Sequence, residues 1–122
     1  MFEKLVSTLL ESRTQAHIFH WQTKSASSFA EHSALGDYYD EVNDLVDELV
    51  ESYQGKYGII ENYTCPGMTN YKGTEQLISY FEKLAEFIQN KRESVKESYI
   101  QNQIDTVEQL IYKTLYKLKF LK

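Results

Sequence analysis

The sequence predicts an all-α protein that folds as one four-helix bundle. Two observations predict this class: apolar residues recur at intervals of three and four over long stretches, and residues that break helices are rare. The chain of 122 residues has one proline and five glycines, and Gly58, Gly67 and Gly73 share one short segment near the middle. Long helices should flank that segment. The length suits one core, so we predict a single domain over residues 1–122.

The first predicted helix runs from Phe2 to about Lys24. Its apolar residues recur mostly at intervals of three, four and seven, as a helix with one buried stripe requires; they are Leu5, Val6, Leu9, Leu10, Ala16 and Phe19. A small polar run, Ser25 to Ser28, interrupts the pattern. Ser28 and Glu31 then fit a capping box that opens a second helix, which should end at about Tyr57, before Gly58.

The second half of the chain predicts two more helices. Thr74 is the expected N-cap of the third, which should run to about Asn90. Ser94 and Glu97 fit another capping box, so we expect the fourth helix to begin there and to reach the end of the sequence. Four lysines near that end complement the negative pole of the helix; they are Lys113, Lys117, Lys119 and Lys122.

Residues 58–73 show no sustained periodicity and should form a crossover. A helix of about 25 residues is roughly 37 Å long. Sixteen extended residues reach about 53 Å. The segment can therefore run along the whole bundle and leave the third helix parallel to the second. Antiparallel helix pairs joined by one long crossover are typical of ferritin-like four-helix bundles, which is the fold we predict.

The composition argues against several classes of partner. Acidic residues outnumber basic ones by 18 to 13, which gives a net charge of −5 and disfavours a surface for binding DNA phosphates. Cys65 is the only cysteine, so no intrachain disulfide is possible and a reducing compartment is indicated. The opening residues show no basic region leading into a long apolar stretch, and no window approaches the roughly 18 apolar residues of a membrane span, so we expect neither secretion nor membrane insertion. We expect a cytoplasmic protein.

The second predicted helix carries a run of acidic residues opposite its apolar stripe. They are Asp37, Asp40, Glu41, Asp44, Asp47, Glu48 and Glu51. Such a run is usually a solvated face. However, Asp47 and Glu51 lie one turn apart near the flank of the stripe, where two carboxylates can share metal ions.

The three histidines admit a similar pair of interpretations. His17 and His20 fall on the apolar side of the first helix, where a lone histidine is more often a core residue, and His32 in the second helix could simply face solvent. Imidazole nitrogen and carboxylate oxygen together are suitable ligands for iron. The Glu-x-x-His motif of ferritins is absent, because the residues three positions before the histidines are Thr14, His17 and Phe29. An acidic face that points away from the core therefore suggests a site between subunits.

The segment from His20-Trp21 to His32, continued without insertion to Asp47 and Glu51, resembles the ferroxidase signature of the Dps family of miniferritins. The resemblance is sharpest from about His17 to Gly58. It implies a di-iron centre at a two-fold interface between subunits, with His20 and His32 from one chain and Asp47 and Glu51 from its partner. Glu51 would bridge the two irons.

The same resemblance implies that ferrous iron is oxidised, preferentially with hydrogen peroxide, and that the ferric product is stored in a hollow dodecamer. Trp21 matches an aromatic residue that the family keeps beside the iron, although interface packing also explains it. Many Dps proteins have an aspartate where this chain has Gly36, which predicts a weakly held second iron. DNA-binding members use a basic tail, and the first helix here begins almost at residue 1, so we do not expect DNA binding.

Two alternatives use the same residues. One is a non-enzymatic assembly protein, a ferritin-like bundle whose histidines pack an interface and whose acids keep it soluble. The other is a structural zinc site formed by the same four side chains, because affinity alone rarely selects iron.

Overall fold

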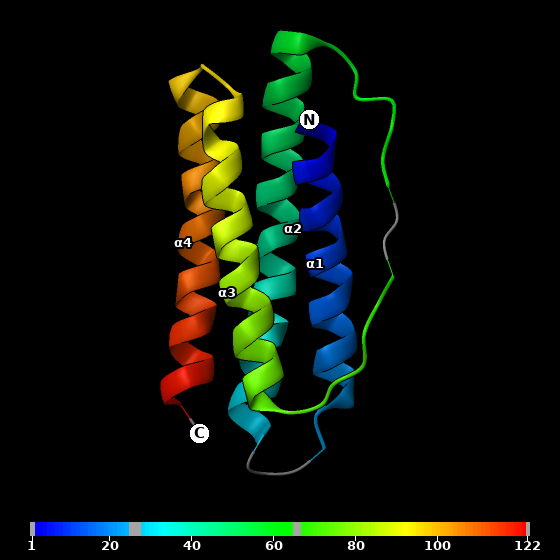
Figure 1. Cartoon of the computed structure of the whole chain (residues 1–122), viewed down its shortest axis with the longest axis vertical. Helices are drawn as coiled ribbons and strands as arrows, with labels where there is room; N and C mark the ends of the chain where they lie inside the picture. Colours follow the sequence, from blue (N-terminus) through cyan, green and yellow to red (C-terminus); the bar gives the residue numbers. More distant parts are fainter. Residues whose placement is uncertain (1, 25–27, 65–66, 122) are drawn as a thin grey trace.

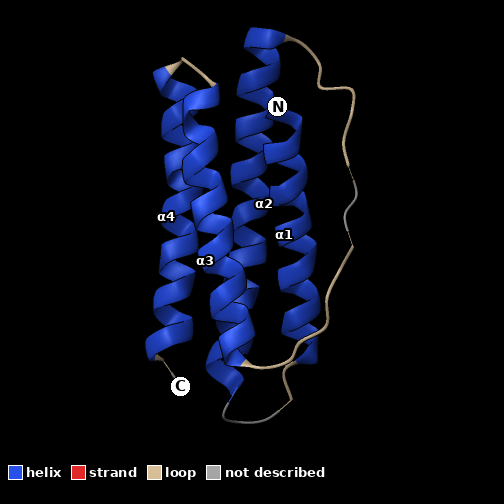
Figure 2. Cartoon of the chain, in the orientation of Figure 1, coloured by secondary structure: helices blue, strands red, loops and turns tan. Residues whose placement is uncertain are grey.

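The computed structural model describes residues 2–24, 28–64 and 67–121, and within these ranges every regular element is helical. The four long helices are α1 (Phe2–Gln22), α2 (Phe29–Tyr57), α3 (Thr74–Lys91) and α4 (Ser98–Phe120), and a short 3₁₀ turn, η2 (Arg92–Ser94), precedes α4. Figure 2 shows these helices connected only by loops. The predicted all-α class is confirmed.

The helices run side by side, with α1 against α2, α2 against α4, and α3 against α4 (Figure 1). α1 and α2 form one antiparallel pair, and α3 and α4 form the other. The segment between α2 and α3 passes along the outside of α1 from one end of the molecule to the other, so α3 starts at the same end as α2 and runs parallel to it. This is the path that the length of residues 58–73 predicts.

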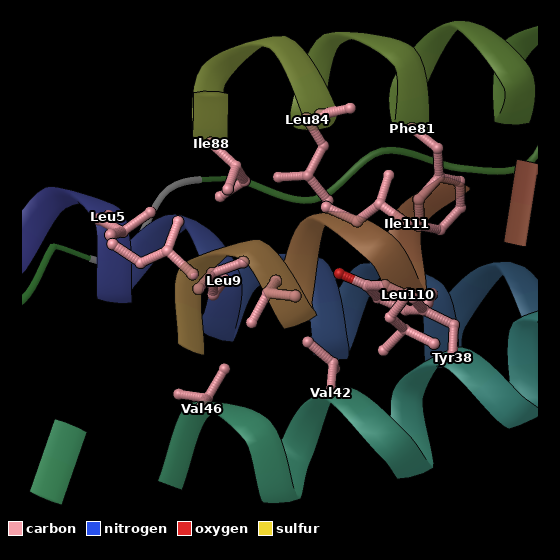
Figure 3. Close-up of a cluster of buried hydrophobic side chains, with 14 of the residues drawn as sticks. Leu5, Leu9, Tyr38, Val42, Val46, Phe81, Leu84, Ile88, Leu110 and Ile111 are labelled. Carbon is pink, nitrogen blue, oxygen red and sulfur yellow. The ribbon is translucent and has the colours of Figure 1, made fainter. Parts of the chain in front are cut away.

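The core lies between the helices and takes residues from all four of them (Figure 3). Leu5, Tyr38, Phe81 and Ile111 are completely buried. Each such side chain stabilises the fold by about 1.5–3 kcal/mol relative to an exposed position. Tyr38 packs edge to face on Phe81, with ring centroids 4.9 Å apart. Packing between opposite helix pairs therefore joins the two hairpins into one core.

Tyr38 brings a hydroxyl group into this core, and Ser12 satisfies it. The Ser12 hydroxyl donates to the Leu9 carbonyl at 2.7 Å, so Tyr38 donates to Ser12 Oγ, also at 2.7 Å. Burial raises the pKa of Tyr38 well above its ordinary value. The phenol consequently remains a neutral donor, and no buried polar atom is left without a partner at this point of the core.

Polar side chains of α1 hold the crossover. Gln15 is buried, and its amide binds both backbone groups of one residue: Oε1 accepts from the Thr69 N–H and Nε2 donates to the Thr69 carbonyl, each at 2.8 Å. Two further bonds follow the same pattern, from Thr64 N–H to Ser7 Oγ and from Tyr71 N–H to Gln22 Oε1. A segment without regular structure thereby finds partners for its backbone. The apolar periodicity that predicted α1 did not reveal these bonds.

Glu31 connects the start of α2 to the start of α3. Its buried carboxylate accepts a hydrogen bond from the Tyr71 hydroxyl at 2.7 Å and another from the Thr74 hydroxyl. Ser28 occupies the N-cap of α2 as predicted, but its side chain makes no capping hydrogen bond. The capping box is therefore not formed on the Ser28 side, and Glu31 acts as a tertiary contact between two helix starts.

Three other boundaries test the sequence prediction. Gly58 ends α2 with φ +99° and donates its N–H to the Gln54 carbonyl, so the predicted stop is confirmed. Thr74 is the first residue of α3 rather than its cap, because Gly73 takes the N-cap position. The capping box at Ser94 is wrong, since Ser94 lies in η2 and α4 begins only at Ser98. Val95 is extended and buried between them, and this packing interrupts the helix.

Some sequence expectations fall outside the described residues, namely those on Cys65, Lys122 and most of the polar run after α1. Within the described part of the chain, no helix combines the length and apolar character needed to cross a membrane.

Candidate metal centre

His20 and His32 meet at the corner where α1 leads into α2. His20 lies in the last turn of α1 and His32 in the first turn of α2, so the antiparallel hairpin brings two residues that are 12 positions apart together. Their rings stack with centroids 3.6 Å apart and planes inclined by 20°. The first predicted pair of ligands is therefore assembled within one chain.

Each imidazole is fixed by the backbone of the other histidine. His20 Nδ1 lies 2.6 Å from the His32 carbonyl oxygen, and His32 Nδ1 lies 2.9 Å from the His20 carbonyl oxygen. A carbonyl oxygen only accepts, so both Nδ1 atoms carry the proton and donate. In the neutral rings the lone pair is then on Nε2, the nitrogen that can bind a cation. The corner thus selects one tautomer for both histidines.

Thr23 completes this corner and was not singled out from the sequence. Its hydroxyl donates to the His20 carbonyl at 2.9 Å, and its Oγ1 lies 3.0 Å from His32 Nδ1, which can share its proton with this oxygen. The sequence signal was a threonine three positions after a helical residue, a spacing that favours a local bond to the backbone carbonyl. Nothing in that signal identified His32 as the second partner.

Gly36 lies beneath the His20 ring. A Cβ atom at this position would come within 3.2 Å of His20 Cε1 and 3.4 Å of His20 Nδ1. The sequence presented Gly36 as a missing acidic ligand. The structure gives its absence of a side chain a steric role, because the stacked and hydrogen-bonded ring occupies the space that any side chain would enter.

Asp47 and Glu51 lie farther along α2, both exposed. Asp47 follows His32 by 15 residues, which corresponds to about 22 Å along the helix. At about 100° per residue, Asp47 points roughly 60° and Glu51 roughly 100° around the helix from His32, and neither can share an ion with it in one chain. Across the described ranges, no three His, Cys, Asp or Glu side chains are grouped closely enough to hold a metal ion.

Most acids on the exposed face of α2 have no ion pair with the residues that the structure describes. Asp37 is bridged to Lys117, with Nζ and Oδ2 3.1 Å apart. No ion pair among the described residues reaches the other acids of this face, which are Asp40, Glu41, Asp44, Asp47, Glu48 and Glu51. Like charges one turn apart destabilise a helix by about 0.2–0.5 kcal/mol per pair. A cation or a basic group from outside the chain would relieve this repulsion.

His17 packs between two aromatic rings and is not one of the proposed ligands. Its ring lies between Tyr39, at a centroid distance of 4.0 Å and nearly parallel, and Trp21, at 3.9 Å and tilted by 36°. Trp21 is nevertheless 67% exposed. The stack of Tyr39, His17 and Trp21 therefore fixes the orientation of an exposed indole on the surface of the α1–α2 hairpin.

Comparison with known proteins gives one match. Residues 20–118 match the model of a family of unknown function (DUF5856), a range that begins at His20 and includes His32, Asp47 and Glu51. No curated protein and no solved structure is significantly similar to the chain.

Proposed function

The chain belongs to the DUF5856 family, and for it we propose the function of a Dps-like miniferritin, a ferritin-like bundle that oxidises ferrous iron at a centre shared between two copies. One observation carries the proposal: the chain assembles two imidazoles with Nε2 available at one place, and on α2 it presents Asp47 about 22 Å and Glu51 about 28 Å away, neither in an ion pair among the described residues. Each chain thus holds two complementary half-sites, and a second copy can complete both.

The pairing of half-sites requires an antiparallel second copy. A two-fold axis across the middle of α2 brings His20 and His32 of one protomer to Asp47 and Glu51 of its partner, and the converse at the other end. Such a dimer contains two equivalent centres. The long crossover and the parallel direction of α2 and α3 support the ferritin-like assignment, and the resemblance of the His20–Glu51 segment supports a larger hollow assembly such as a dodecamer.

The donor set fits ferrous iron as a substrate. Two neutral imidazoles and two carboxylates supply nitrogen and oxygen donors together, and carboxylates accommodate both ferrous and ferric ions. With hydrogen peroxide as oxidant, two ferrous ions lose one electron each, the O–O bond breaks, and two protons are taken up to give two waters. Paired transfer of both electrons avoids release of hydroxyl radical. Glu51 is placed to bridge the ions in this proposal, and His20, His32 and Asp47 are terminal ligands.

Ferrous titration tests the proposal. Metal-free protein is loaded anaerobically with about two ferrous ions per centre, and peroxide is then added while ferric absorbance is followed. The wild type should oxidise iron rapidly, and His32→Ala and Asp47→Ala should each lose this activity. Glu48→Ala is the matched control, because Glu48 is an exposed neighbour of Asp47 on the same helix. Unchanged rates in both ligand variants reject the enzyme and leave a non-enzymatic assembly protein.

A structural zinc site is the second candidate, and Gly36 favours it. With no carboxylate at position 36, the proposed centre has four protein donors, which is the number that zinc takes in closed structural sites. Zinc that binds at one ion per centre, stabilises the dimer and blocks iron oxidation would support this reading. Iron oxidation in the presence of a stoichiometric amount of zinc would exclude it.

A further inference from the structure

Trp21 is a large apolar side chain with only one covered face. The indole rests on His17 at a centroid distance of 3.9 Å, yet 67% of the residue is exposed. Exposed indoles of fixed orientation are characteristic anchors of protein interfaces, where they fill a pocket of the partner. Because this is the only tryptophan of the chain, the observation also provides its own spectroscopic probe.

A groove of about 430 Å³ lies on the same α1–α2 side of the molecule, toward the other end of the hairpin. Its lining mixes aliphatic and polar side chains of both helices with one crossover tyrosine, and Val6 and Val46 are buried within it; the lining is Val6, Leu10, Asn43, Val46, Asp47, Val50 and Tyr63. A groove that offers both apolar contact and acceptors suits an indole, which needs apolar contact for its rings and one acceptor for its N–H.

The register of α1 against α2 relates the tryptophan to the groove. Two contacts set this register: Arg13 donates to Asn43 Oδ1 at 2.8 Å, and His17 stacks on Tyr39. The point on α2 midway between His32 and the Asp47–Glu51 pair falls between residues 40 and 41. In the observed register it faces the peptide between residues 15 and 16 of α1. A two-fold axis at that level exchanges position 21 of one chain with position 10 of the other.

Position 10 is Leu10, in the wall of the groove. We therefore propose that in the symmetric pair Trp21 of each copy fills the groove beside Asp47 of the other. This inference rests on the proposed function, because the same two-fold axis completes the metal centres. It adds the contact that selects the partner: a second copy of this chain, recognised by an indole and a groove that combines aliphatic side chains with a carboxamide and a carboxylate.

The chemistry of the groove agrees with this occupant. The indole rings would cover Leu10, Val50 and Tyr63, and the indole N–H would donate to the Asp47 carboxylate or to the lone pair of Asn43 Oδ1 that Arg13 leaves free. Trp21 follows His20 in the chain, and Asp47 is the groove residue that would bind the metal. Docking the indole therefore aligns the two half-sites before any cation arrives.

The contact is an anchor within a wider interface. An aromatic side chain buries about 150–250 Å² when covered, so the exposed part of Trp21 offers roughly 100–170 Å². A stable dimer buries about 800 Å² on each partner. The surrounding α1–α2 face must supply the remainder, and two Trp21 contacts per dimer supply its best-packed points.

Trp21 fluorescence of the metal-free full chain tests the proposal. Dilution from about 50 μM to about 50 nM should dissociate the pair, and the emission maximum should shift to the red in step with the loss of dimer in sedimentation measurements. Trp21→Ala and Tyr63→Ala should each weaken the dimer, the former by about thirtyfold or more. Tyr116→Ala removes an aromatic residue on α4 that is 57% exposed, and as the matched control it should leave the dimer unchanged.

A mixing experiment sharpens the test. Leu10→Arg blocks the groove but keeps the indole, whereas Trp21→Ala keeps the groove but lacks the indole, so the mixture should form heterodimers more tightly than either variant forms homodimers. Circular dichroism establishes that Leu10→Arg is folded, and Tyr63→Ala serves if it is not. A dimer whose Trp21 emission equals that of the monomer, or a Tyr116→Ala defect as large as that of Trp21→Ala, overturns the inference. A chain that stays monomeric also overturns it.

These readings are independent of iron chemistry. A dimer with buried Trp21 that does not oxidise iron retains the inference and rejects the proposed function. An active enzyme whose Trp21 stays exposed does the reverse.

Discussion

The two helix hairpins differ in how their charged residues are paired. On α3, η2 and α4 several charges are paired with one another: Arg92 makes a two-pronged contact with Asp105 at 2.6 and 3.0 Å, and Lys119 pairs with Glu82 at 3.1 Å. On α1 and α2 the carboxylates beyond Asp37 have no ion pair among the described residues, two imidazoles have Nε2 to spare, and a tryptophan is exposed. Both hairpins contribute to the core, but the features on which the proposed centre rests lie on α1 and α2.

Removal of a buried ring of α3 should have the largest effect on the free energy of unfolding. Phe81→Ala removes a completely buried ring that packs on Tyr38, and should lower the free energy of unfolding by about 3–5 kcal/mol. Urea denaturation measures this loss. Tyr112→Ala on α4, at an exposed position, should change stability by less than about 0.5 kcal/mol. Equal losses in the two variants would show that burial does not control stability in this hairpin.

Asp47→Ala should separate function from stability in the other hairpin. The side chain is exposed and unpaired among the described residues, so its loss should alter the free energy of unfolding by no more than about 0.5 kcal/mol. Iron oxidation should fall by at least about a hundredfold, since loss of even an outer contact to a metal ligand costs ten- to a hundredfold. Stopped-flow absorbance and urea denaturation measure the two effects. A variant that is equally active, or one that is unfolded, contradicts the contrast between hairpins.

Two glycines of α2 provide a matched pair. At Gly55 nothing lies within 4 Å of a new Cβ, so Gly55→Ala should stabilise the helix by about 0.5–1 kcal/mol. At Gly36 the new Cβ would come within 3.2 Å of a His20 ring that stacking and the bond to the His32 carbonyl hold in place. Gly36→Ala should lose that gain and cost about 1–3 kcal/mol through overpacking. Thermal denaturation should give opposite shifts, and equal shifts would refute the steric role of Gly36.

The smallest expected effect concerns pH and the far end of the bundle. The Tyr57 hydroxyl donates to Glu97 Oε1 at 2.5 Å, which lowers the pKa of Glu97 and raises the pKa of Tyr57 to about 12. Because the pKa of Glu97 is depressed on folding, its contribution is present above the unfolded value of about 4.3 and is lost as pH falls through the folded value. Tyr57→Phe should bring the Glu97 titration, followed by NMR, back toward that unfolded value. An unchanged titration would remove Tyr57 as the cause.

The sequence predicted what depends on periodicity and length. The helix stripes, the stop at Gly58 and the bundle-long crossover follow from spacing, which local residues determine. The sequence did not predict the start of α4, because Val95 is extended and buried in the core, and a capping pattern carries no information about tertiary burial. The resemblance implied that His20 and His32 act together, and the structure places them at adjacent helix ends. The sequence did not predict the contacts of Thr23 or the steric role of Gly36, because both depend on how two rings stack across the hairpin.

The reciprocal bonds between the two histidines tie cation affinity to the integrity of one helix end. The His20 carbonyl belongs to the last turn of α1, where backbone oxygens lack partners in their own helix. Fraying of this turn would break the hydrogen bond of His32 Nδ1 while the rest of the molecule stays folded. The proton could then move to Nε2, and Nε2 could no longer bind a cation. In the proposed centre, metal uptake should consequently weaken on warming at temperatures below the melting transition, because opening of this one corner removes a ligand atom.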